Sequence, residues 1–247
     1  SDVCSSDLDE REVMTKDELI SLFSLDRVQK KSAVFDPEKL SWMNGQHLAR
    51  RSSGELVPLV VARLAARGVD PAGWQGKEPW LEQLVELLKV RSPTLDELAS
   101  MAEPYLADPV EYDAESVAKH WAKERPAVLE RLVGLRGALA GASWERDPLE
   151  AETRKLAETL GISAGKLIHP LRVAITGRQH SPGMFEVLVL LGRERSLARL
   201  DGALQRLREM YGSLRKERGG LDNYGVSLTV LALEAHYAAE EAPPAGD

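Results

Sequence analysis

The sequence is poor in cysteine and in aromatic residues, and both shortages exclude whole classes of protein. Its 247 residues include one cysteine, Cys4, which rules out an intramolecular disulfide framework and any metal site built from several cysteines. Aromatic residues make up 5%, and the 19 glycines and 13 prolines form no collagen-like or low-complexity pattern. No apolar run approaches the roughly 18 residues of a membrane span, so no membrane partner is expected.

The sequence also lacks the short motifs that mark many enzyme active sites. It contains no glycine-rich phosphate loop of either standard spacing, no His-Glu-x-x-His and no Gly-x-Ser-x-Gly. Its five histidines are scattered, with no pair at a metal-binding interval: His47, His120, His169, His180 and His236. We therefore expect no catalytic residue, no metal site and no cofactor within this chain.

Charge is distributed unevenly along the chain. The formal net charge of −7 argues against a uniformly basic nucleic-acid-binding protein, and no DNA partner is expected. Residues 161–220 nevertheless carry eleven lysines and arginines against five acidic residues. A local polyanion site requires such a basic region, because neutralisation of phosphates dominates affinity for nucleic acids. A helix with a solvated arginine face explains the same counts, and both interpretations stay open.

Apolar residues recur at helical spacing from about residue 15 through most of the chain, which predicts an all-α fold. Thr15 and Glu18 have the spacing of a capping box, in which a hydroxyl and a carboxylate satisfy backbone N–H groups at a helix start. Asp36-Pro37 places a capping carboxylate before a first-turn proline. These signals predict helices that begin near residues 16 and 37.

A few local patterns are ambiguous. Residues 186–191 are apolar enough for a strand, but helical sequence continues around them, which favours a helix. Asn44-Gly45 follows a helical pattern and is typical of a helix C-cap. Trp42 and Phe185 are expected to lie in the core.

The first eight residues, SDVCSSDL, have neither the basic n-region nor the apolar h-region of a signal peptide. They resemble the translation of a sequencing-library adapter, and the alternative is an ordinary polar tail. If residues 1–8 are adapter-derived, Cys4 is not native and the natural protein begins upstream.

Two separate segments resemble a known family. Residues 34–45, VFDPEKLSWMNG, are similar to the stretch just after the catalytic domain of bacterial-type glutamyl-tRNA synthetases. Residues 169–177, HPLRVAITG, and 181–186, SPGMFE, are similar to the C-terminal signature of the same family and occur in the same order. The resemblance extends from about Asp9 to Leu207. Glutaminyl-tRNA synthetases share the first signature but have β-barrel anticodon domains, so the helical pattern favours the glutamyl family.

The resemblance implies a parent enzyme that activates glutamate with ATP and Mg²⁺ and attaches it to tRNA(Glu). Its ATP-binding motifs do not occur in this sequence, so the chain is expected to bind tRNA without catalysing, as part of a monomeric cytoplasmic ligase. The resemblance implies that residues 9–51 are the end of a tRNA stem-contact region. Residues 52–103 and 104–207 would be two helical anticodon-binding subdomains, and residues 208–247 a C-terminal extension of unknown role.

The same resemblance implies which residues contact the anticodon. Arg91 matches the arginine that contacts the third base, and Arg172 matches the arginine that contacts the first. The segment Ser181, Pro182, Gly183 and Met184 matches hydroxyl and backbone contacts to the first two bases. An arginine at position 91 is further typical of family members restricted to tRNA(Glu). From the residues alone, Arg91 could instead stabilise a helix C-terminus, and Arg172 could pair with a carboxylate.

A second hypothesis is a helical protein-interaction module that descends from such a domain and has lost its RNA role. Residues 226–239 include an apolar helical pattern that could dock on a partner. Retention of Arg91, Arg172 and the 181–183 segment favours RNA binding, because a protein-binding descendant has no reason to keep them.

Overall fold

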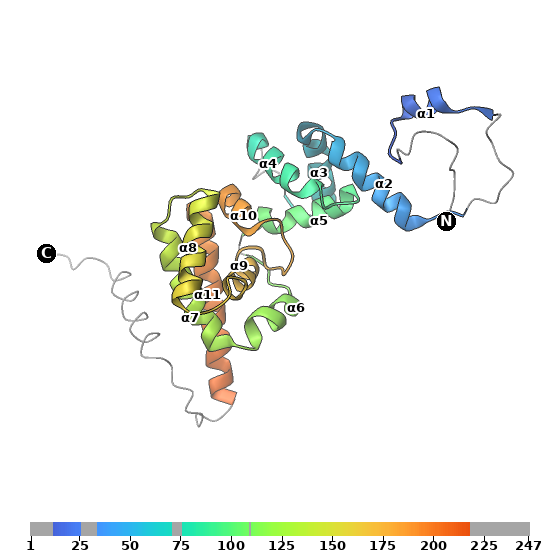
Figure 1. Ribbon diagram of the computed structural model, residues 1–247. Helices are drawn as coiled ribbons and strands as arrows, with labels where there is room; N and C mark the ends of the chain where they lie inside the picture. The colour runs from blue at the N-terminus through green and yellow to red at the C-terminus, as the bar shows by residue number, and fades with distance from the viewer. Residues whose placement is uncertain (1–11, 26–33, 71–75, 109, 218–247) are drawn as a thin grey trace. The chain divides into compact units, whose positions relative to one another are not determined.

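The computed structural model describes residues 12–25, 34–70, 76–108 and 110–217, and every regular element in these ranges is a helix. The predicted all-α fold is therefore confirmed. The chain divides between Leu106 and Ala107 into two compact units. Figure 1 shows the helices α1–α5 of the first unit and α6–α11 of the second.

The first unit begins with two helices at the predicted capping signals. Thr15 and Glu18 form the expected capping box, with the Thr15 backbone N–H donating to Glu18 Oε2 at 2.7 Å. Asp36 accepts from the N–H groups of Glu38 and Lys39 at the start of the second helix. The five helices of this unit are α1 (Lys16–Leu22), α2 (Pro37–Arg50), α3 (Ser53–Ala66), α4 (Glu78–Lys89) and α5 (Leu95–Leu106).

Helices α3, α4 and α5 pack against one another and form the core of the first unit. The apolar residues of α4 recur every three to four positions, so Leu81, Leu84, Val85 and Leu88 all lie on its buried face. This packing fixes the end of α4 and the turn that follows it, which carries Arg91.

The second unit is a bundle in which the long helix α11 packs along α7 and α9. Fully buried side chains from four elements fill its centre: Trp121, Leu132, Leu135, Leu149, Leu171 and Ile175. Its elements are α6 (Ala114–Val117), the single π-helical turn η3 (Ala118–Ala122), α7 (Arg125–Gly141), α8 (Arg146–Thr159), α9 (Gly165–Thr176), α10 (Met184–Leu191) and α11 (Arg193–Glu217).

The ambiguous patterns resolve in different ways. The apolar segment 186–191 belongs to the helix α10, and Phe185 is buried, as predicted. The C-cap prediction for Asn44-Gly45 is wrong, because both residues lie inside α2. Trp42 is also not a core residue, since it lies on the exposed face of α2 with 44% of its surface accessible.

Two predictions concern segments beyond the described ranges: the adapter-like residues 1–8 and the apolar pattern at 226–239. Within the ranges that are described, no helix is both long and apolar enough to span a membrane.

Candidate functional site

Arg172 and Ser181, two residues of the predicted site, are joined by a hydrogen bond. Arg172 lies on the third turn of α9, and Ser181 lies in the segment that links α9 to α10. The Arg172 Nε–H donates to Ser181 Oγ at 2.9 Å, and the Ser181 hydroxyl donates to the carbonyl oxygen of Pro182 at 2.9 Å. Arg172 as a whole is half-buried, and its hydrogen bond to the loop orients the guanidinium.

The loop begins at Gly177, which ends α9 in the left-handed conformation, with φ of 71°. A side chain at this position would overlap the carbonyl oxygen of Glu111. Only glycine accommodates both the positive φ and the close approach. The Gly177 carbonyl in turn accepts from the Asp113 N–H at 2.9 Å, which holds the start of the loop on the segment before α6.

The middle of the loop is held by α6 and η3. The Gln179 N–H donates to Ser116 Oγ at 2.9 Å, and its side-chain oxygen accepts from Lys119 Nζ at 2.8 Å. Ser116 also donates through both its N–H and its hydroxyl to Asp113, and these hydrogen bonds lower the pKa of the Asp113 carboxyl. The loop that presents Ser181 therefore has a defined conformation on a helical support.

The other predicted loop residues offer backbone groups rather than side chains. Pro182 and Met184 are buried, and Met184 is the first residue of α10. No side chain caps this helix start, so its first N–H groups have no capping acceptor. The Glu186 carboxylate lies where a side chain on Gly183 would be, and it pairs with Arg146 at 2.8 Å.

Arg91 belongs to the other unit, in the turn that follows α4. Its backbone N–H donates to the Leu88 carbonyl at 3.0 Å, and its side chain is exposed. Lys89, two residues before Arg91, is buried. Its ammonium group donates to the Arg51 carbonyl at 2.9 Å and pairs with the Glu86 carboxylate at 2.7 Å. These contacts fix the last turn of α4.

Helix α2 holds the same turn from the other side. The Asn44 side chain donates to the Pro93 carbonyl, and a Cβ on Gly45 would lie 3.1 Å from the Pro93 Cα. The small residue at position 45 thus permits the close approach of α2 to the turn. This explains why an Asn-Gly pair occurs within a helix, where the sequence pattern alone suggested a helix end.

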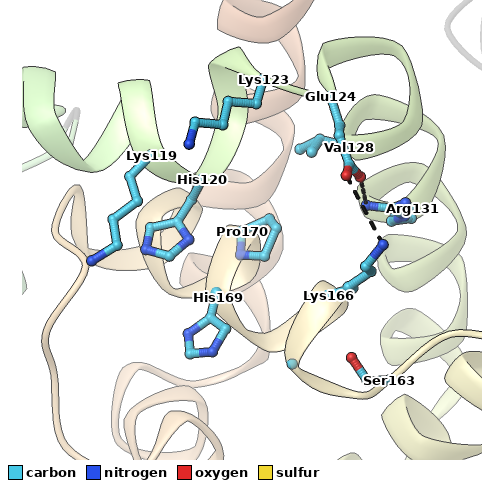
Figure 2. Close-up of a pocket in the computed structure, with 11 residues that line it drawn as sticks. Lys119, His120, Lys123, Glu124, Val128, Arg131, Ser163, Lys166, His169 and Pro170 are labelled. Atoms are coloured by element: carbon cyan, nitrogen blue, oxygen red, sulfur yellow. Dashed lines mark hydrogen bonds and ion pairs between the residues drawn. The ribbon is translucent and has the colours of Figure 1, made fainter.

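A group of polar residues that no sequence pattern indicates adjoins Arg172. Arg172 Nη1 lies 3.3 Å from His169 Nδ1, and the His169 ring stacks on that of His120 with 5.3 Å between ring centroids. Figure 2 shows these two rings side by side, next to Lys119 and Lys123. The pair could not be found from spacing, because η3 and α9 are far apart in the sequence.

The described part of the chain holds no group of three or more histidine, cysteine, aspartate or glutamate side chains placed to bind a metal ion.

A family model and several relatives of known function match this chain, and they point to the same kind of protein. The family model described as an anticodon binding domain matches residues 55–204. The glutamate–tRNA ligase of Syntrophotalea carbinolica is 37% identical over 199 residues, which cover 80% of this chain and 41% of that protein. The glutamate–tRNA ligase of Syntrophobacter fumaroxidans is 38% identical over 197 residues, with 79% and 41% covered. The chain thus spans about two fifths of the length of these relatives.

The fold also matches a solved structure. The crystal structure of a glutamate tRNA ligase from Elizabethkingia meningosepticum superposes with a TM-score of 0.65 at 24% identity, over 80% of this chain and 38% of that one. The family model covers both Arg91 and the segment from Arg172 to Met184. The chain therefore belongs to the anticodon binding domain family.

Proposed function

We propose that this chain is the anticodon-recognition portion of a glutamate–tRNA ligase and that it binds tRNA(Glu). The observation that carries the proposal is the hydrogen bond between Arg172 Nε and Ser181 Oγ. It brings together, at the junction of α9 and α10, an arginine and a hydroxyl that the family resemblance assigns to neighbouring anticodon bases.

The chemistry of this junction suits an unpaired base. An arginine presents several N–H donors in one plane and can stack on a base as well as donate to its edge. The Arg172 guanidinium donates to Ser181 through Nε and lies against His169 at Nη1, so its plane has a fixed direction. The loop adds the Ser181 hydroxyl and the uncapped N–H groups at the start of α10, which can contact the edges of splayed single-stranded bases.

Arg91 is the proposed contact to the third anticodon base. Its exposed side chain projects from a turn held by Lys89 and Asn44, so the backbone at this position is well supported. By the family resemblance, an arginine here restricts the ligase to tRNA(Glu), and we include this preference in the proposal.

The whole ligase would use ATP and Mg²⁺ to join glutamate to the tRNA, and this chain would supply RNA binding rather than the chemical step. In this assignment residues 9–51 contact the tRNA stem, and 52–103 and 104–207 are the anticodon-binding subdomains. The ligase would act as a cytoplasmic monomer, with tRNA rather than DNA or a membrane as its partner.

The test is a titration of the chain with tRNA(Glu) and with the same tRNA changed at its third anticodon base, at two salt concentrations. We expect salt-sensitive binding that is weaker for the altered tRNA by about 1–3 kcal/mol, the usual cost of a lost base contact. Equal binding of both tRNAs would contradict recognition of that base. An absence of binding at low salt would favour the protein-interaction hypothesis instead.

A further inference from the structure

A cavity of about 320 Å³ lies in the second unit, and His169, the neighbour of Arg172, is one of the residues that line it. It is lined by η3 and the two residues that follow it, by the first two turns of α7, and by Ser163 and the first two turns of α9. Figure 2 shows His120 and His169 next to Pro170 on one side, and Lys166 reaching toward Glu124 and Arg131 on the other. None of these residues belongs to the anticodon contacts proposed above.

The charged groups that line the cavity are mostly cationic. Lys119, Lys123, Arg131 and Lys166 contribute four positive charges, against a single carboxylate, that of Glu124. Such an excess in one hollow attracts an anion, because low-dielectric walls concentrate the field of the charges that line them.

The single carboxylate is already occupied by neighbouring cations. Glu124 accepts from Arg131 at 2.9 Å and lies 3.9 Å from Lys166, and these contacts lower the pKa of the Glu124 carboxyl. Lys119 is directed to Gln179 by its 2.8 Å hydrogen bond. Within the described ranges no acidic partner of Lys123 is found. The cavity thus holds ammonium groups that its own carboxylate does not neutralise.

The two stacked histidines complete the polar lining. Burial lowers the pKa of each, and the neighbouring cations Lys119 and Arg172 lower it further. A neutral imidazole both donates and accepts hydrogen bonds, so each ring can donate to an anion without adding charge.

The cavity adjoins the residues proposed to contact the anticodon bases, which indicates the kind of anion that it binds. His169, which lines the cavity, lies 3.3 Å from Arg172, the proposed contact to the first anticodon base. For a nucleotide whose base contacts Arg172, the cavity is therefore the adjoining cationic hollow that its own phosphate would meet. Contacts to phosphates are the usual companions of base contacts and fix the position of the nucleic acid on the protein.

We propose that this cavity, lined by Lys119, Lys123, Lys166 and the His120–His169 pair, binds a backbone phosphate of the RNA whose first anticodon base lies at Arg172. The site rests on the proposed tRNA-binding function and extends it. Its contacts supply affinity and position rather than sequence preference.

The test compares three single variants of the full chain, each of which removes one positive charge. Lys123→Met and Lys166→Met change the cavity, whereas Lys155→Met, on the exposed surface of α8, is the matched control. Each is titrated with tRNA(Glu) and with a tRNA changed at its first anticodon base, at several salt concentrations. The double variant Lys123→Met/Lys166→Met is included to enlarge the effect.

We expect the double variant to bind both tRNAs more weakly by on the order of tenfold, with the ratio between the two tRNAs unchanged. The slope of log affinity against log salt should become shallower by about 0.7 for each lost contact. Lys155→Met should match the unaltered chain. Cavity variants that behave like Lys155→Met, in a chain that still distinguishes the two tRNAs, would overturn the phosphate site and leave the proposed function standing.

A chain that does not distinguish the tRNAs at all would instead remove the proposed function, and the phosphate site with it. A titration with inorganic phosphate at constant ionic strength tests whether the cavity binds a free phosphate ion rather than a phosphate of the RNA. Saturable binding of inorganic phosphate that the double variant abolishes, without any change in tRNA affinity, would assign the cavity to a free anion and overturn its role in RNA binding.

Discussion

Arg172 and Ser181 are joined by a 2.9 Å hydrogen bond from the arginine Nε–H to the serine hydroxyl. The bond links the third turn of α9 to the loop before α10, so the loop holds the arginine side chain in place. The loop itself is hydrogen-bonded to α6 and η3 through Gln179.

Replacement of Ser181 by alanine should weaken binding of tRNA(Glu) by about threefold to tenfold. The change removes the acceptor that orients Arg172, and a net hydrogen bond contributes about 0.5–1.5 kcal/mol. Ser181→Thr retains the hydroxyl and should bind nearly as well as the unaltered chain. Equilibrium titration measures both variants, and equal losses for alanine and threonine would show that the hydroxyl is not the relevant group.

Gly177→Ala should destabilise the second unit far more than Gly161→Ala. Both glycines have positive φ, of 71° and 63°, so each alanine incurs the left-handed strain of about 1–2 kcal/mol. A Cβ at position 177 would also overlap the Glu111 carbonyl, whereas nothing lies within 4 Å of one at position 161. We expect a total cost of about 3 kcal/mol or more at Gly177. Denaturant unfolding measures the difference, and similar costs at both sites would contradict the close packing of the loop.

Arg91→Gln should narrow the difference in affinity between tRNA(Glu) and glutamine tRNA. Glutamine lacks the charge and the planar fork of donors that arginine offers to a base. Arg63→Gln is the control, because Arg63 is also an exposed arginine of the first unit and lies 3.6 Å from Asp96. Competition binding with the two tRNAs provides the readout. If Arg91→Gln shows the same difference in affinity between the two tRNAs as the unaltered chain, Arg91 does not contribute to tRNA selection.

The folded chain should lose stability as the pH falls through the range in which free histidine titrates. Burial, followed by nearby positive groups, lowers the pKa of His120 and His169 below the ordinary value near 6.5. Lys119 and Arg172 lower the pKa of both rings, and His180 and the other ring of the pair lower that of His120. Because the unfolded chain binds protons at a higher pH than the folded chain, the contribution is complete above about pH 6.5 and decreases below it.

Urea unfolding at pH 7.5 and pH 5.5 tests this dependence. The variant His120→Gln/His169→Gln lacks both titrating rings and should lose less stability between the two pH values than the unaltered chain. Identical losses in both proteins would show that the histidine pair does not cause the acid sensitivity in this range. The Asp113 and Glu124 carboxyls do not contribute to it, because their pKa values are lowered and their contribution disappears only at more acidic pH.

Much of the secondary structure could be predicted because local chemistry determines it. The Thr15 and Asp36 caps act on N–H groups two or three residues away, and the apolar residues of α4 have helical spacing whatever the rest of the chain does. The helix α10 was predictable because its apolar run continues between helical neighbours.

Tertiary relationships were not predictable in the same way. Asn44-Gly45 has the sequence of a helix end but lies inside α2, because its role is to approach Pro93, a residue far along the chain. Trp42 is a large apolar residue of the kind expected in a core, yet it lies on the exposed face of α2. The stacked pair of His120 and His169 depends on the packing of η3 against α9, which no spacing in the sequence encodes.

The most direct test of the account concerns the first anticodon base. The affinities of the unaltered chain and of Arg172→Gln are measured for tRNA(Glu) and for the same tRNA with that base replaced. We predict that the unaltered chain binds the altered tRNA more weakly by about 1–3 kcal/mol and that Arg172→Gln binds the two tRNAs equally. Equal binding of both tRNAs by the unaltered chain, or full discrimination by Arg172→Gln, would contradict base recognition at Arg172.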